Sequence, residues 1–351
     1  MVALITSLEQ WEEVFRPGLG VEQDLPANYP DASKHNIMVW ADAIGDNNPL
    51  WTDEDYAKKS RFGTITAPPT FFWKVCSANT TLQVPPLPGA EFPATQNIGH
   101  LNVQDVVESY RPVCVGDHFK VKVKIVDIFR KQLKTLGPSI FCQVQANFIN
   151  QHGDLTATIW QTQCMSFSDG SPRRRSAPLA DKAGVVAKDN NKLTHDRKRR
   201  GAEPRYWEDV EVGQELDPLE KGVYTVTEMQ RYNVNCQYGP RIFYGKRLGG
   251  GGNGLERQAA WRLHDFGMQR TNWLGELCTD WMGDAGTLKY LWSQIRQVNF
   301  IGDINVVRGT VSKKYVKDGE HLVDCDIHVE NQGGVVSAPG RATIALPSKQ
   351  K

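Results

Sequence analysis

The most informative stretch of this 351-residue chain reads Ala41-Asp42-Ala43-Ile44-Gly45-Asp46-Asn47-Asn48-Pro49-Leu50-Trp51. It continues an apolar pattern that predicts a short helix over residues 36–44, and it then enters a tight polar turn. Farther along, the chain reaches Ala67-Pro68-Pro69-Thr70. Because proline is favoured in the first turn of a helix, this run predicts a second helix over residues 69–80. The sequence therefore predicts a polar turn set between two helices.

The length and composition indicate a protein of two globular domains. A chain of 351 residues suits two domains of about 150 residues each. The formal net charge of +1 provides no strong field for nucleic acid or for a membrane surface. The sequence has no run of 18 apolar residues that would span a bilayer, and the first residues do not resemble a secretion signal, so we expect a cytoplasmic protein. Its seven cysteines are scattered without a CxxC pair, which argues against a zinc site or a disulfide framework.

A basic, polar stretch separates the two halves. It opens at residues 171–176 and closes at residues 197–201, with few large apolar residues between. This composition predicts a linker. A nucleic-acid-binding arm is the alternative, but no aromatic residue interleaves the charges, so the linker is favoured. We therefore expect an N-terminal domain over 1–170, a linker over 171–203 and a second domain over 204–351.

Several motifs recur in both halves. Gly116-Asp117 and Gly302-Asp303 each precede an alternating apolar strand pattern. After each strand comes a similar turn, beginning at Asn150 in the first half and at Asn331 in the second. Repeats of this size indicate a duplicated domain.

The second half contains the pattern of a buried helix followed by strands. Trp273, Leu277 and Trp281 fall at i, i+4 and i+8, which places them on one apolar face of a helix. The strands that follow would form an antiparallel sheet on this helix. The periodicity alone predicts an α+β fold.

The motifs together resemble one known family. The 41–51 turn, the Ala67-Pro68-Pro69-Thr70 helix start and the run from Tyr110-Arg111-Pro112 to Gly116-Asp117 come in the order typical of MaoC-like acyl dehydratases, the R-specific enoyl-CoA hydratases. The resemblance covers nearly the whole chain outside the linker, with the second half as a more diverged copy. It implies two tandem hot-dog domains, each an antiparallel sheet wrapped around a long helix.

The resemblance also implies a chemistry, namely hydration of an enoyl-CoA or dehydration of a 3-hydroxyacyl-CoA thioester, with no metal or redox cofactor. Such a reaction needs a base for water, and hydrogen-bond donors at a helix start for the thioester oxygen. Asp46 matches the family's catalytic aspartate and Asn48 its supporting amide, whereas Trp51 stands where the family has histidine. Because tryptophan cannot accept a proton, His100 is a minor alternative partner. Asp46 could instead be a turn carboxylate that caps nearby N–H groups.

If the second half carries the chemistry, His264 and Asp265 are its candidate acid and base. The alternative is that Asp265 starts the long helix electrostatically and that His264 is a surface residue. The sequence alone does not decide between these two roles. The residues that we expect to contact the substrate are Trp51, Pro69, Thr70, Gln269 and Arg270.

A different class of function is also compatible with the sequence. Since Trp51 replaces the histidine, the chain could be a catalytically silent subunit that binds the acyl thioester for a hydratase complex. A thioesterase is a third alternative. We expect an acyl-CoA thioester as the partner, no nucleic acid or membrane, and homo-oligomers formed by pairing of hot-dog sheets. The acyl chain, the choice between CoA and a carrier protein, and the half that carries the chemistry all remain open.

Overall fold

The computed structural model describes residues 4–76, 84–167, 199–235 and 264–350. The sheet strands of the first half are β2 (Gln23–Leu25), β4 (Ile98–Ser109), β5 (Lys120–Leu133), β6 (Gly137–Ile149) and β7 (Leu155–Phe167). Those of the second half are β8 (Leu219–Val223), β9 (Thr287–Gln294), β10 (Ile304–Lys317), β11 (Glu320–Asn331) and β12 (Val336–Ala345). The helices are α1 (Leu8–Phe15), α2 (Lys34–Ile44), α3 (Pro49–Thr52), α4 (Glu54–Lys59), α5 (Phe72–Val75), α6 (Val226–Asn235) and α8 (Gly267–Met282). Short 3-10 turns cover Arg16–Gly18 and Trp207–Asp209, and β1 (Leu4–Ile5) pairs with β3 (Ala94–Thr95).

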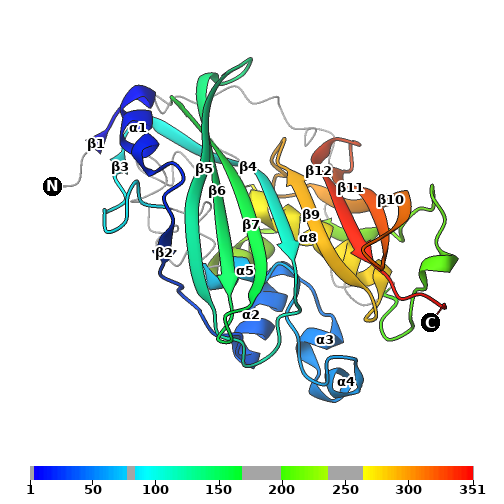
Figure 1. Cartoon of the computed structure of the whole chain (residues 1–351). Coiled ribbons are helices and arrows are strands. Elements are labelled where there is room, and N and C mark those ends of the chain that lie inside the picture. Colours follow the sequence, from blue (N-terminus) through cyan, green and yellow to red (C-terminus); the bar gives the residue numbers. More distant parts are fainter. Residues whose placement is uncertain (1–3, 77–83, 168–198, 236–263, 351) are drawn as a thin grey trace.

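Within the described residues, ten strands form one continuous antiparallel sheet (Figure 1). Its order is β2-β5-β6-β7-β4-β9-β12-β11-β10-β8, so each half contributes five neighbouring strands. The halves meet where β4 pairs with β9, with Val106 opposite Trp292 and Val107 opposite Leu291. The two half-sheets are thus joined edge to edge within one chain. The domain boundaries stay a prediction, because most of the expected linker lies outside the described residues.

The repeated sequence motifs form the same turns in both halves. Gly116 and Gly302 have φ of 99° and 95°, a region that favours glycine. The aspartate after each glycine accepts a hydrogen bond of 2.8 Å from the N–H three residues before it. The side-chain oxygens of Asn150 and Asn331 each accept from the N–H groups two and four residues later. The same local hydrogen bonds in two equivalent places support a duplicated domain.

Helix α8 is the buried helix of the second half. Every residue from Met268 to Met282 is buried, which includes the predicted apolar face of Trp273, Leu277 and Trp281. The helix packs against β9 and β12 and also contacts β4 of the first half. It ends at Gly283, whose φ of 72° stops helical continuation. The polar residues of α8 are buried as well, and their partners form much of the candidate site.

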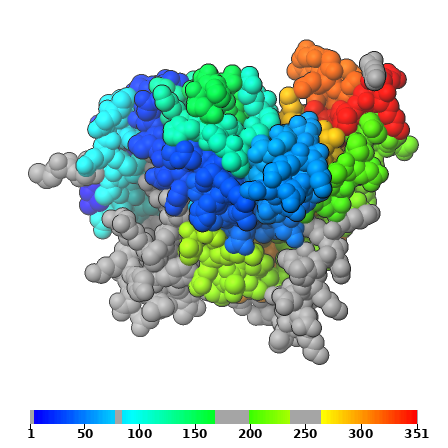
Figure 2. Space-filling model, turned by 90° about the horizontal axis from the view of Figure 1, so that it is seen from below, coloured from blue at the N-terminus to red at the C-terminus, as the bar shows by residue number. Residues whose placement is uncertain are grey.

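The helices of the first half flank this region. Helix α2 confirms the helix predicted over 36–44, and α5 lies within the helix predicted over 69–80. Residues 77–83 lie outside the described part of the chain, so α5 is described for four residues. On the face that Figure 2 shows, α2 lies beside α6. Between these two helices, the buried rings of Trp40 and Tyr232 lie 6.1 Å apart. The helices of the described residues are too short or too polar to cross a bilayer.

Candidate active site

Two adjoining helix caps shape the polar turn. Helix α2 ends at Gly45, whose φ of 71° is left-handed. The Gly45 N–H donates to the Asp42 carbonyl and the Asp46 N–H to the Ala41 carbonyl, which is the Schellman pattern. These bonds satisfy two carbonyls at the end of α2. Asp46 therefore stands in a fixed position directly beyond the helix.

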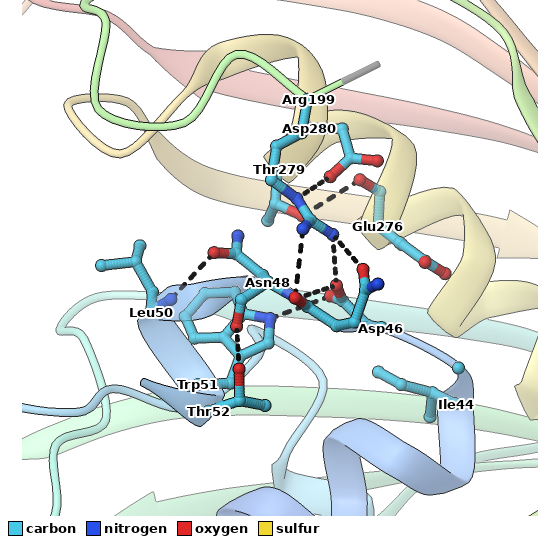
Figure 3. A network of polar contacts seen from close by, with 12 residues as sticks. Ile44, Asp46, Asn48, Leu50, Trp51, Thr52, Arg199, Glu276, Thr279 and Asp280 are labelled. Atoms are coloured by element: carbon cyan, nitrogen blue, oxygen red, sulfur yellow. Dashed lines mark hydrogen bonds and ion pairs between the residues drawn. The ribbon is translucent and has the colours of Figure 1, made fainter. Parts of the chain in front are cut away.

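The next helix begins two residues later. The Asn48 side chain caps α3 by accepting from the Leu50 N–H at 3.0 Å, and Pro49 takes the first helical position. The Asn48 N–H donates to Asp46 Oδ1 at 3.1 Å. Trp51 is buried, and its indole Nε1 donates to Asp46 Oδ2 at 2.9 Å (Figure 3). The residue that replaces the family's histidine is thus a hydrogen-bond donor to the candidate base.

Arg199 contacts the same carboxylate from the other side. Its Nη2 lies 3.1 Å from Asp46 Oδ1, and its Nε donates to Asp280 Oδ1 at 2.7 Å (Figure 3). It also donates to the backbone carbonyl and side-chain oxygen of Asn47, each at 3.2 Å. The sequence placed Arg199 in the linker and gave no sign of these contacts. The Asp46 turn is therefore bound to α8 through one guanidinium group.

Asp46 borders a cavity of about 410 Å³ that lies between the two halves, which we name the Asp46 cavity. Its wall includes Gln269 from the first turn of α8. The Tyr224 hydroxyl donates to Gln269 Oε1 at 2.8 Å, which leaves the amide nitrogen as the donor end of that side chain. That nitrogen has no hydrogen-bond partner among the described residues. A carboxylate from the first half and an amide donor from the second half therefore border one cavity.

A buried ion pair supports the Asp46 cavity. Lys221 Nζ lies 2.8 Å from Glu276 Oε2, and both side chains are at least 89% buried. Lys221 also donates to the carbonyls of Ile44 and Gly45, at 3.3 and 3.4 Å. A cation at the carbonyl end of α2 is favourable, since that end carries partial negative charge. The lysine thus ties α2 to β8 and α8.

A second cavity has a volume of about 260 Å³, and we name it the Trp51 cavity. Asn48, Trp51 and Pro69 line it together with Met282 and Leu288 from the second half. Thr70, also expected at the substrate, is buried outside the lining of both cavities. Of the predicted substrate-binding residues, Trp51 and Pro69 therefore line the Trp51 cavity and Gln269 lines the Asp46 cavity, whereas the other two line neither.

His264 and Asp265 lie outside the lining of both cavities. Asp265 is buried, and its Oδ2 lies 2.9 Å from Arg270 Nε in an ion pair whose side chains are almost wholly inaccessible. It also accepts two bonds of 3.0 Å from Asn299. Burial raises the pKa of Asp265, whereas the Arg270 charge lowers it. The His264 ring is exposed, with Nδ1 2.7 Å from the Asp265 carbonyl. Asp265 and Arg270 thus form a buried ion pair, and the catalytic role of Asp265 stays a prediction.

One further buried carboxylate was not predicted from the sequence. Asp105 on β4 accepts from Gln161 at 3.0 Å and from the Thr271 hydroxyl at 2.9 Å. Burial raises the pKa of Asp105, and these donors lower it. The available signal was the strand alternation, because Asp105 falls on the same face as the buried Val107. An inward-facing carboxylate of this kind links the sheet to α8.

The minor alternative His100 lies on β4, where its Nε2 is 3.4 Å from the Thr95 hydroxyl. Burial lowers the pKa of His100. Among the described residues, no histidine lines either cavity. In the same part of the chain, no three His, Cys, Asp or Glu side chains converge as metal ligands would.

Solved structures share this architecture over almost the full chain. A MaoC-like dehydratase superposes with a TM-score of 0.67 at 15% identity, over 95% of this chain and 99% of its own. A Mycobacterium tuberculosis protein described as having a double hot-dog fold superposes with a TM-score of 0.57 at 14% identity, over 93% and 96% of the two chains. Residues 28–159 match the family model of the FAS1-like dehydratase domain region. The chain has the double hot-dog fold of these structures.

Curated relatives match part of this chain. A probable enoyl-CoA hydratase alpha subunit from Thermomonospora curvata is 26% identical over 141 residues, which is 38% of this chain and 43% of that relative. The chain thus spans less than half of that relative's length. The residues that match the dehydratase model, 28–159, include the Asp46 turn.

Proposed function

We propose that this protein hydrates an enoyl thioester, or dehydrates the corresponding 3-hydroxyacyl thioester, in the Asp46 cavity. The observation that supports this most strongly is that Asp46 and Gln269, from different halves, border the same cavity. Asp46 would take the proton from water as it adds to C3 of the acyl group. The Gln269 amide, at the positive end of α8, would donate to the thioester oxygen as negative charge develops there.

The direct test is to follow the loss of the conjugated-thioester absorbance with short, branched and aromatic enoyl-CoA esters. We expect turnover of at least one class of ester, and a loss of roughly 10²- to 10⁴-fold in kcat for Asp46→Asn. The matched control is Asp55→Asn, because Asp55 lies on the surface of α4 outside both cavities. Turnover that survives Asp46→Asn would remove Asp46 from the mechanism. Absence of turnover with every ester would contradict a self-sufficient hydratase.

Two observations favour a second candidate, a subunit that binds the acyl thioester but lacks chemistry of its own. Asp46 is engaged by Trp51, Asn48 and Arg199, and one relative is named a probable enoyl-CoA hydratase alpha subunit. In that case the protein would bind a saturated acyl-CoA, and Asp46→Asn would leave the dissociation constant unchanged. Calorimetric titration of both proteins, run beside the absorbance assay, separates the two candidates.

The partner of either function would be an acyl thioester, carried by CoA or by a carrier protein. Parallel assays with CoA and pantetheine esters would distinguish recognition of the nucleotide from recognition of the thioester arm. The predicted pairing of hot-dog sheets already occurs within the chain, at β4 and β9. Homo-oligomers and a cytoplasmic location remain predictions of the sequence.

A further inference from the structure

We propose that Arg199 is a positioning residue that fixes the direction of the Asp46 carboxylate at the cavity. This inference rests on the proposed function, because it assigns Arg199 a part in the same reaction. Arg199 does not line the Asp46 cavity, so it would act through Asp46 rather than on a ligand. Its contacts reach the Asp46 turn and α8 together (Figure 3).

The guanidinium holds two carboxylates at once. Its Nε donates to Asp280 while its Nη2 lies on Asp46 Oδ1, and the side chains of Arg199, Asp46 and Asp280 are 14%, 2% and 6% exposed. The planar arginine fork has five N–H donors in fixed directions, so it can serve both acceptors without bending. A lysine has a single charged atom and cannot match both directions. The geometry is therefore specific to arginine.

Asp280 gives the arrangement its rigidity. It lies on the buried helix α8, so the Arg199 side chain is anchored to an element that is packed on both sides. The Asn47 contacts hold the other edge of the guanidinium to the turn. Arg199 thus holds the Asp46 turn in a fixed position relative to α8.

The two oxygens of Asp46 are fixed from different directions. Trp51 Nε1 donates to Oδ2, and Arg199 lies on Oδ1 beside the Asn48 N–H. Removing Arg199 takes one donor from Oδ1, and any rotation of the carboxylate that follows would lengthen the indole contact to Oδ2. The Trp51 indole N–H therefore reports the orientation of Asp46 without any catalytic assay.

The experiment compares Arg199→Gln and Arg199→Lys with the wild-type protein and with the control Arg200→Gln. Arg200 is the adjacent arginine, and its side chain contacts Glu203 and Pro204 rather than the Asp46 turn. Hydrogen exchange of the Trp51 indole is read by nitrogen-15 NMR, with the signal assigned by its loss in Trp51→Phe. The chain has 10 tryptophans, so the assignment is practical.

We expect Arg199→Gln to speed exchange of the Trp51 indole by at least about tenfold and to lower kcat by roughly 100-fold, with KM within about threefold. Arg199→Lys should restore part of both effects, and Arg200→Gln should match the wild type. Unchanged indole exchange in both Arg199 variants overturns the proposal, as does a change in KM with kcat retained. If the wild-type protein converts no ester, the proposed function fails, whereas the indole exchange still decides whether Arg199 orients Asp46.

Discussion

The buried pair of Asp265 and Arg270 makes the sharpest prediction about stability. Asp265→Ala leaves the Arg270 charge in an interior where its side chain is 1% exposed. Breaking such a pair from one side costs about 3–5 kcal/mol, because the remaining charge is buried without its partner. The carbonyl of Ser337 contacts Arg270 Nη1 at 3.1 Å, but a neutral carbonyl cannot replace a carboxylate. Since domains have about 5–15 kcal/mol of total stability, the variant should be close to unfolding.

The assay is urea unfolding followed by tryptophan fluorescence, with a check that the m-value is unchanged. The matched control is Asp326→Ala, which removes an Asp–Arg pair on the surface. There Asp326 Oδ1 lies 3.5 Å from Arg341 Nε, with side chains 63% and 74% exposed. An exposed pair of this kind contributes less than about 1 kcal/mol. If Asp265→Ala cost no more than Asp326→Ala, the claim that Arg270 depends on this carboxylate would be refuted. Loss of turnover in a stably folded Asp265→Asn protein would instead indicate a catalytic role.

Three further predictions follow from single contacts. Trp51→Phe removes the indole bond to Asp46 and should lower the free energy of unfolding by about 1.5–3 kcal/mol, measured in urea; a loss below 0.5 kcal/mol would contradict that bond. Tyr224→Phe takes away the donor that holds the buried Gln269 amide, so kcat should fall about tenfold and stability by about 1–3 kcal/mol, and an unaltered kcat would remove this amide from the mechanism. Burial raises the folded pKa of Asp105, so its stabilising contribution is complete below the unfolded pKa of about 3.9 and is lost as pH rises. The stability of the wild type relative to Asp105→Asn should therefore decrease as the pH rises above about 4, and a constant difference in urea midpoints would exclude this titration.

The features that depend on local periodicity could be read from the sequence. The apolar face of α8, the strand alternation of β5 and the paired glycine turns all follow from spacing within a few residues. In β5, Val121, Val123 and Ile125 are buried as the alternation predicts. The α+β class with tandem hot-dog units, implied by the family motifs, is confirmed by the double hot-dog neighbours. Local patterns were sufficient there because each element buries one regular face.

The contacts of the candidate site could not be read in the same way. Arg199 reaches Asp46, and Lys221 reaches Glu276, across separations that no helix or strand period relates. Charged residues in such positions look like solvated surface until the fold brings their partners together. Trp51 shows the reverse, since the sequence indicated that it cannot accept a proton, and the structure adds that it donates to Asp46. The sequence therefore predicted what the Trp51 side chain can do chemically, but it did not predict which side chains contact one another in the site.

The two ends of the sheet have a consequence for assembly. Among the described residues, the sheet ends at β2, with three residues, and at β8, with five. Short edge strands give another chain little to extend, which is a common safeguard against uncontrolled polymerisation. The edges at which the two half-sheets meet, β4 and β9, pair with each other. The duplication therefore leaves those two inner edges with a partner inside the same chain.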